Sequence, residues 1–365
     1  MYKGILSNLL YTLIIGLIIT ACGSSKPTSG KVVDDYISEA KICADVNNNK
    51  LADDGKENCL QTTSQGGYKF SKKRTELLVV TGGTDIGTGK EFKGILFAPP
   101  ESSVVTPLTT LVVSVQEEGN KSLEEAQEIV KKNLGLSETK VNLTTFDPLF
   151  QLQFEKDTTK KEIAQKVLAQ QTNIQIILTI TATTITAVSK DIQEQHVTIE
   201  ASNQIAQLIL NNSTEESSST INSQANIETI IESTALKTFN SNKQEDKEAL
   251  ASIENIKTIV AKQTEEITKN TIIAITTTPI DSEEESGLNI IKESNIGILL
   301  VTNNKTGSIQ DNIKNSISTG NSRLLESIDI QNEIEHMKDE IIERREVDKK
   351  DEEENKKTGA EGGSL

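Results

Sequence analysis

The chain has 365 residues, with 38 basic and 54 acidic side chains and a formal net charge of −16. A negative field of this size repels a phosphate backbone, so the composition argues against a nucleic-acid-binding protein. The two histidines, His196 and His336, have no second imidazole or cysteine cluster near them in the sequence. This argues against a zinc site and against a Cys/His nucleophile pair.

Residues 1–21 have the pattern of a secretory signal: Lys3, an apolar run "LLYTLIIGLIIT", and small residues before Cys22. The segment "ITAC" at residues 19–22 resembles the bacterial lipobox, in which the cysteine becomes the lipidated first residue. The alternative is an uncleaved membrane helix. Its core is on the short side of the ~20 residues that span a bilayer, and Asn8 interrupts it. We therefore expect Cys22 to carry a lipid anchor.

The residues after Cys22 indicate where the mature protein resides. Lipidation implies a protein held on a membrane outside the cytoplasm, and several acyl chains hold it more firmly than one. Gly23 follows the cysteine instead of Asp. By resemblance to Gram-negative lipoproteins, this favours the outer membrane or the cell surface. Residues 22–30, which include "GSSKPTSG", are predicted to be a flexible tether.

Residues 31–104 are predicted to form a small β-sandwich-like module. They contain short β-branched or aromatic runs between turn residues: "KVVDDYI", "AKICADV", "GGYKF", "ELLVVTGG" and "GILFAPP".

An acidic loop, "CADVNNNKLADDGKENC" at residues 43–59, lies within this module. Its predicted calcium ligands, at loop positions one, three, five, seven (through the backbone carbonyl) and nine, are Asp45, Asn47, Asn49, Leu51 and Asp53. An all-oxygen set suits calcium, whereas zinc would take thiolates or imidazoles. Lys50 replaces the usual Gly, and Lys56 replaces the bidentate Glu, with Glu57 one place late. We expect weak binding, of the ~10⁻⁴ to 10⁻³ M kind. The alternative is a polar turn whose Asx side chains cap their own backbone.

The two cysteines that remain after lipidation of Cys22 bracket this loop. Outside the cytoplasm, cysteines are more often paired than free, so a Cys43–Cys59 disulfide is predicted. Closing a loop of this size stabilises a fold by about 3 kcal/mol in the chain-entropy model.

Residues 105–347 are predicted to be helical, because neither Gly nor Pro occurs from residue 149 to 278. Thr106 can cap a first helix with Pro107 at its first position. Ser122 and Glu125 form a capping box for a second helix, and Gly135 is its stop signal.

The longest predicted helix runs from about residue 160 to 193. Its apolar seam steps by four and three through Ile174, Leu178, Thr181, Ile185, Val188 and Ile192. Residues 174–180 also alternate by two, so a strand remains the alternative there. Further helices are expected near 196–211, 223–239 and 246–275, and Ile330, Ile334, Met337 and Ile341 repeat the helical spacing. The charge-dense residues 348–365 are predicted to be a disordered tail.

Three segments carry a resemblance to a family. "VVDDYISEAKICADVNNNKLADDGKENCLQTTSQGGYKF" resembles the β-sandwich modules of bacterial surface adhesins and carboxypeptidase-regulatory-like domains. "VTGGTDIGTGKEFKGILFAPPESSVVTPLTTLVVSV" and "AQEIVKKNLGLSETKVNLTTFDPL" resemble the helical region of the "VTPLTTL" type that follows such modules in secreted and lipid-anchored proteins. The likeness covers about residues 31–210 and implies an α+β fold without enzyme activity.

The sequence therefore predicts a non-enzymatic, lipid-anchored protein that acts by display or binding, adhesin-like or structural. A protein partner would bind an exposed apolar seam of the helices, although such seams also pack on one another. One alternative is a surface or periplasmic hydrolase, which would need positioned acid, base or nucleophile groups. Another is a dockerin-like assembly module. Dockerins carry two calcium loops on helices, whereas this chain has one loop in a β context.

Overall fold

The computed structural model describes residues 26–53, 55–189, 191–212, 221–280, 285–303, 309–326, 329, 332–340 and 342–343. The predicted signal (1–21), the lipidation site Cys22 and the predicted tail (348–365) lie outside these residues. So do Ile330 and Ile341 of the last predicted helical repeat.

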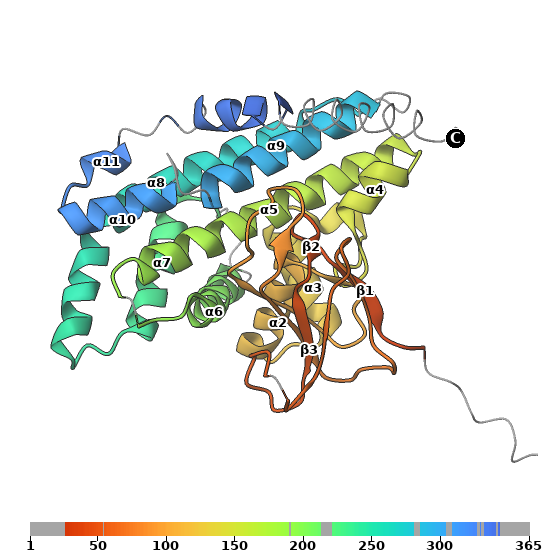
Figure 1. Cartoon of the computed structure of the whole chain (residues 1–365), viewed down its shortest axis with the longest axis horizontal. Helices are drawn as coiled ribbons and strands as arrows, with labels where there is room; N and C mark the ends of the chain where they lie inside the picture. The colour runs from red at the N-terminus through yellow and green to blue at the C-terminus, as the bar shows by residue number, and fades with distance from the viewer. Residues whose placement is uncertain are drawn as a thin grey trace, which may run out of the picture.

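Short strands occupy the N-terminal part of the chain (Figure 1). They are β1 Ser29–Val32, β2 Ile37–Ser38, β3 Lys41–Asp45, β4 Asn58–Gln61, β5 Gly67–Lys69, β6 Leu77–Thr81, β7 Thr84–Asp85, β8 Ile95–Ala98 and β9 Val104–Val105. A four-stranded antiparallel sheet has the order β4-β3-β6-β8. In a second, smaller sheet of three strands, β1 pairs antiparallel with β5 and parallel with β9. Strands β2 and β7 pair antiparallel as a separate two-stranded sheet.

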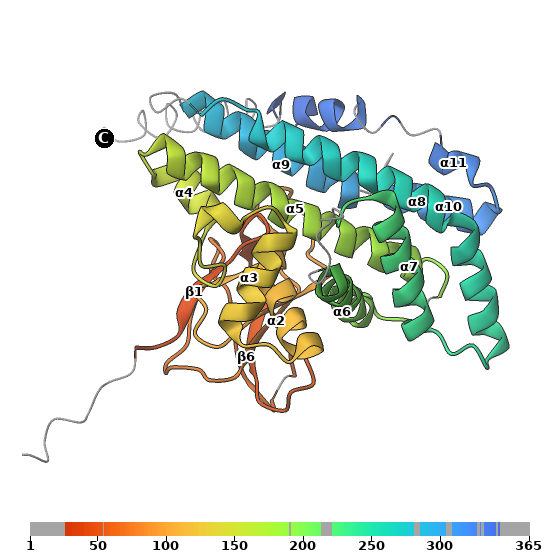
Figure 2. The same cartoon turned by 180° about the vertical axis from the view of Figure 1, so that it is seen from behind.

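Helices joined by short turns and loops follow the strands. They are α2 Pro107–Gly119, α3 Leu123–Asn133, the 3₁₀ helix η1 Ser137–Thr139, α4 Pro148–Phe154, α5 Thr158–Thr186, α6 Glu194–Asn212, α7 Gln224–Thr238, α8 Gln244–Thr276, α9 Glu285–Asn303, α10 Ile309–Thr319 and α11 Arg323–Glu326. Residues 332–340 are also helical. Helices α5, α8 and α9 run side by side, and α2 and α3 cover the strands when the molecule is seen from behind (Figure 2). The predicted α+β order, a small strand-rich part followed by a larger helical part, is confirmed.

The first two helices begin where their capping residues predict. Thr106 accepts from the Thr109 amide and Pro107 is the first residue of α2. Ser122 and Glu125 form the predicted capping box of α3. Gly135 has φ of +67°, the left-handed conformation that suits glycine just after a helix.

The Thr-rich segment is a helix, so the strand alternative for residues 174–180 is wrong. The predicted end near residue 193 is also wrong, because α5 stops at Thr186, before Val188 and the polar residues that follow it. The helix is buried over most of its length, and both apolar and polar side chains lie in its buried part. Some of its buried hydroxyls bond within the helix, as where Thr184 Oγ1 donates to the Ile180 carbonyl at 2.7 Å, and Thr172 Oγ1 donates to Asn295 Oδ1 of α9 at 2.6 Å.

The four-stranded sheet is buried on both faces. On one face, Ile42, Leu78 and Leu96 pack against Val32 and Val105 of the smaller sheet. On the other face, the side chains that pack against helix α2 at Val113 are Val79, Ile95 and Phe97. Helix α2 therefore covers a face that an independent sandwich module would expose to solvent. The finer prediction of a two-sheet sandwich module stays a prediction.

Hydrogen bonds join the strand part to the helices. The Phe97 amide of β8 donates to Thr110 Oγ1 at 2.9 Å, and Thr109 Oγ1 donates to the Phe97 carbonyl at 2.6 Å. Gln171 Nε2 of α5 donates to the Val33 carbonyl at 2.9 Å. Strand β9 crosses the predicted boundary at residues 104 and 105, and β1 begins at Ser29, inside the predicted tether. Two apolar clusters, one around Val33 and Leu168 and one around Phe97 and Val113, also contain residues of both parts, so the strands and the helices share buried surface.

We predict that Thr110→Val destabilises the whole protein. The substitution leaves the buried Phe97 amide without its acceptor, which costs about 1–3 kcal/mol. Urea unfolding followed by circular dichroism measures the change. Thr229→Val, on an exposed face of α7, is the matched control and should change the free energy of unfolding by less than about 0.5 kcal/mol. Equal effects of the two substitutions would show that the Thr110 contact is unimportant.

Candidate functional site: a disulfide-closed acidic loop

The predicted disulfide is present at the base of the acidic loop. Cys43 in β3 and Cys59 in β4 lie opposite each other in the strand register, and their sulfur atoms are bonded. The bond closes a loop with a sequence separation of 16 residues. It therefore holds together the two strands from which the loop emerges.

Asp45, at the end of β3, organises the first turn of the loop. Its side chain is 1% exposed, and its two carboxylate oxygens accept from the Asn49 amide at 3.2 Å and the Lys50 amide at 2.9 Å. Lys50 has φ of +59°, a left-handed conformation. This is the position where calcium loops use Gly for a sharp turn, so the loop makes that turn despite the lysine.

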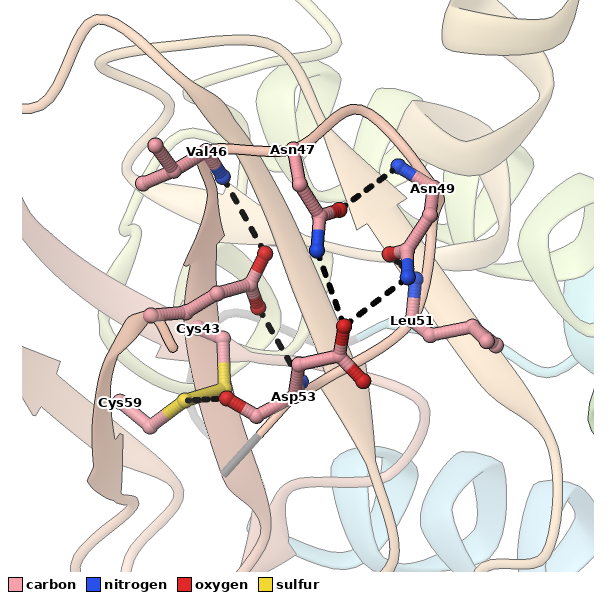
Figure 3. Close-up of a disulfide and its surroundings, with 8 residues drawn as sticks. Cys43, Val46, Asn47, Asn49, Leu51, Asp53 and Cys59 are labelled. Atoms are coloured by element: carbon pink, nitrogen blue, oxygen red, sulfur yellow. Dashed lines mark hydrogen bonds between the residues drawn. A yellow bond between two sulfur atoms is a disulfide. The ribbon is translucent and has the colours of Figure 1, made fainter. Parts of the chain in front are cut away.

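Asn47 and Asn49 each form an Asx turn and also bind Asp53 (Figure 3). Their Oδ1 atoms accept from the Asn49 and Leu51 amides at 3.0 and 2.9 Å. Their Nδ2 groups both donate to Asp53 Oδ2 at 2.9 Å. These two donors lower the pKa of the Asp53 carboxyl below its usual value. The Asx-turn interpretation thus describes how the loop is held in this structure.

Glu57, which was not among the predicted ligands, also holds the loop backbone. Its Oε1 accepts from the Val46 amide at 3.2 Å and its Oε2 from the Asp53 amide at 3.1 Å. Burial raises the pKa of the Glu57 carboxyl, and the nearby Asp45 carboxyl raises it further. Gly55 has φ of +76°, a conformation that lets the chain turn before Glu57. A count of twelve positions along the sequence, starting from Asp45, ends at Lys56 and takes no account of this turn.

The donor atoms of the loop are of the kind that a hard cation such as calcium prefers. The loop carries the carboxylates of Asp45, Asp53 and Glu57 and two amide carbonyls, and each Asn Oδ1 keeps a second lone pair beside its Asx-turn bond. In this structure the oxygens of the three carboxylates do not all lie within 4.8 Å of one another, so cation binding would have to draw them together. A cation would replace the two Nδ2 donors on Asp53. Within the described residues, the one group of three or more His, Cys, Asp or Glu side chains close enough to share an ion is Cys43, Glu57 and Cys59, but both sulfurs belong to the disulfide. The oxidised protein therefore offers no thiolates for zinc at this place.

The loop also contacts the helices. Lys50 forms an ion pair with Glu117 of α2, and its Nζ lies 5.7 Å from the centre of the Phe97 ring. The side chain of Leu51, predicted as a ligand only through its carbonyl, packs with Phe97 and Val113. A change in the conformation of the loop would therefore alter its contacts with helix α2.

A second surface feature is a groove of about 690 Å³ where the strand part meets α4 and α9. Tyr36, Phe154 and Ile296 are among the residues that line it. Phe154 is 59% exposed, and its ring centre is 4.7 Å from that of Phe150. Apolar surface exposed in this way is typical of an interaction site.

The remaining predicted features have clear positions. The seam residues Ile174, Leu178, Thr181 and Ile185 are at most 2% exposed, so they pack against neighbouring helices and are not available to a partner. His196 and His336 are exposed on helices. Within the described part of the chain, no helix has the length and apolar character needed to cross a bilayer.

Comparison of the chain with protein-family models, with curated proteins and with solved structures gives no match. The functional assignment therefore depends on the residues themselves.

We predict that reduction of the disulfide lowers stability. Replacing both Cys43 and Cys59 by Ser should reduce the free energy of unfolding by about 3 kcal/mol, because the unfolded chain regains the entropy of an open loop. Guanidinium unfolding of oxidised, reduced and double-variant protein measures this. Reduced wild-type protein is the control and should behave like the variant. Identical midpoints for oxidised and reduced protein would contradict the prediction.

Proposed function

We propose that this chain is a lipid-anchored, extracytoplasmic protein that acts by display or binding, adhesin-like or structural. The observation that carries the proposal is the disulfide-closed acidic loop. Structural disulfides persist in oxidising compartments and are rare in the cytosol, so the Cys43–Cys59 bond supports a location outside the cytoplasm. The signal-like residues 1–21 support export from the cytoplasm, and the lipobox-like "ITAC", which ends at Cys22, supports a lipid anchor.

A binding role is supported by the groove beside α4. Its exposed aromatic side chains, Phe154 within it and Phe150 next to it, resemble the anchors that dominate protein–protein interfaces. Lys31 and Lys292 also line the groove. We assign the partner to this groove in place of the helical seam expected from the sequence, because the residues of that seam are buried.

The acidic loop is assigned a structural role as a weak calcium loop of the strand part. Glu57, and not Lys56, supplies the last carboxylate. The Lys50–Glu117 ion pair links the loop to α2, so bound calcium would stiffen the junction between the strands and the first helix. The resemblance to adhesin-type β-sandwich modules, which carry such loops, also supports a structural calcium loop.

We predict that Cys22→Ser abolishes anchoring. Without the thiol there is no site for acylation, so metabolic labelling with a fatty acid should be lost and the protein should leave the detergent phase. Immunoblotting of both phases measures this. Cys43→Ser, which removes a different cysteine, is the control and should stay labelled. Unchanged labelling of the Cys22 variant would refute the lipid anchor.

We also predict that Glu57→Gln removes calcium binding from the loop. The Val46 and Asp53 amides donate to Glu57, so their NMR resonances should shift when millimolar calcium is added to the wild-type protein. Those shifts should disappear in Glu57→Gln and persist in Lys56→Gln, the matched control. Magnesium should shift them far less, because it demands octahedral geometry. Resonances indifferent to calcium would leave a disulfide-closed Asx turn without a metal.

A further inference from the structure

A small polar cavity lies where the strand part meets three helices. Its volume is about 40 Å³. It is lined by Asp34, between β1 and β2, by Asp85 of β7, and by Gln175 of α5, Glu194 of α6 and Gln310 of α10. A water molecule needs about 10–15 Å³ of such space, so the cavity has room for an ion with one or two waters.

Asp34 is the unexplained group in this cavity. Its side chain is 4% exposed, and its Oδ1 is buried with no hydrogen-bond partner. Burial raises the pKa of the Asp34 carboxyl well above its usual value, and the carboxyls of Asp85 and Asp35 raise it further. A buried carboxylate without a partner is costly, so the Asp34 carboxyl either takes up a proton or is compensated by a cation.

The neighbours of Asp34 do not provide that compensation. The Asp85 carboxylate already accepts from the Thr88 amide and hydroxyl, both at 2.7 Å, and from the Asp35 amide at 3.3 Å. Lys90 and Lys93 also line the cavity, and Lys93 lowers the pKa of Glu194, although burial raises that pKa more strongly. The charges that act on Asp34 itself are both acidic.

Neutral oxygen donors complete the lining. Gln175 Nε2 donates to Thr179 Oγ1 at 3.2 Å and Gln310 Nε2 donates to Thr183 Oγ1 at 3.0 Å. In each glutamine the amide nitrogen is thus engaged, which leaves the carbonyl oxygen as the acceptor end. Calcium accepts six to eight oxygens in flexible geometry, including carboxylates, amide carbonyls and water.

We propose that this cavity is a calcium site, with Asp34 as its anionic ligand and the amide oxygens of Gln175 and Gln310 as neutral ligands. The cation neutralises the unpartnered carboxylate and bridges the β1–β2 loop to helices α5 and α10. This site is separate from the acidic loop, which joins β3 to β4 and shares no lining residue with the cavity.

The experiment uses the chain from residue 23 to 365 with Glu57→Gln, so that the loop does not contribute. In this parent, calcium should raise the melting temperature by several degrees and shift the Asp35 and Thr88 amide resonances, because both amides bind Asp85. Adding Asp34→Asn should abolish both effects. It should also raise the melting temperature in chelator, since the asparagine amide can donate to the neighbouring carboxylates.

Asp157→Asn is the matched control, since Asn caps the start of α5 as well as Asp does, and it should keep the full calcium response. The proposal would be overturned if calcium changed neither the melting temperature nor the amide resonances of the parent, or if the Asp34→Asn variant kept the response. Either result would favour a water-filled cavity beside a protonated carboxyl. An equal response to magnesium would overturn the calcium assignment.

Discussion

The structure depends on one constraint: the β4-β3-β6-β8 sheet is too apolar on both faces to be exposed on either. Val79, Ile95 and Phe97 point to one face and Leu78, Val80 and Leu96 to the other, and all six are at most 1% exposed. The smaller sheet covers one face. Helix α2 must cover the other, and Thr109 and Thr110 fix its position by binding both backbone groups of Phe97.

This constraint explains why the acidic loop and the helices are connected. The loop leaves β3 and returns through β4 at the edge of the same sheet, so Lys50 and Leu51 reach α2 and the side chains beneath it. The disulfide holds the two strand ends together whether or not a cation is bound. A loop built in this way keeps its turns through Asx hydrogen bonds, and a weakly bound cation would add stiffness without being needed for folding.

Much of the local structure was readable from the sequence. The Thr106 and Ser122 caps, the Cys43–Cys59 pairing and the helical nature of the Thr-rich segment follow from rules that act over a few residues. The sheet topology was not predicted, because the parallel pairing of β1 with β9 joins residues about seventy positions apart. Glu57 was not predicted as a ligand, because the ligands were assigned by counting positions along the sequence. Such a count does not show where the turn at Gly55 places the side chains that follow it. The cavity at Asp34 was also invisible, since its walls come from five distant segments.

The central claim is that the strands and helices form one cooperative unit. Native-state hydrogen exchange in increasing urea tests it most directly, by comparing the Phe97 amide of β8 with the amides of α5. The account predicts that both exchange through openings of the same free energy, with the same dependence on urea. If the strand amides instead exchanged through an opening of clearly lower free energy while α5 stayed protected, the strand part would be an independent unit and the shared core would be contradicted.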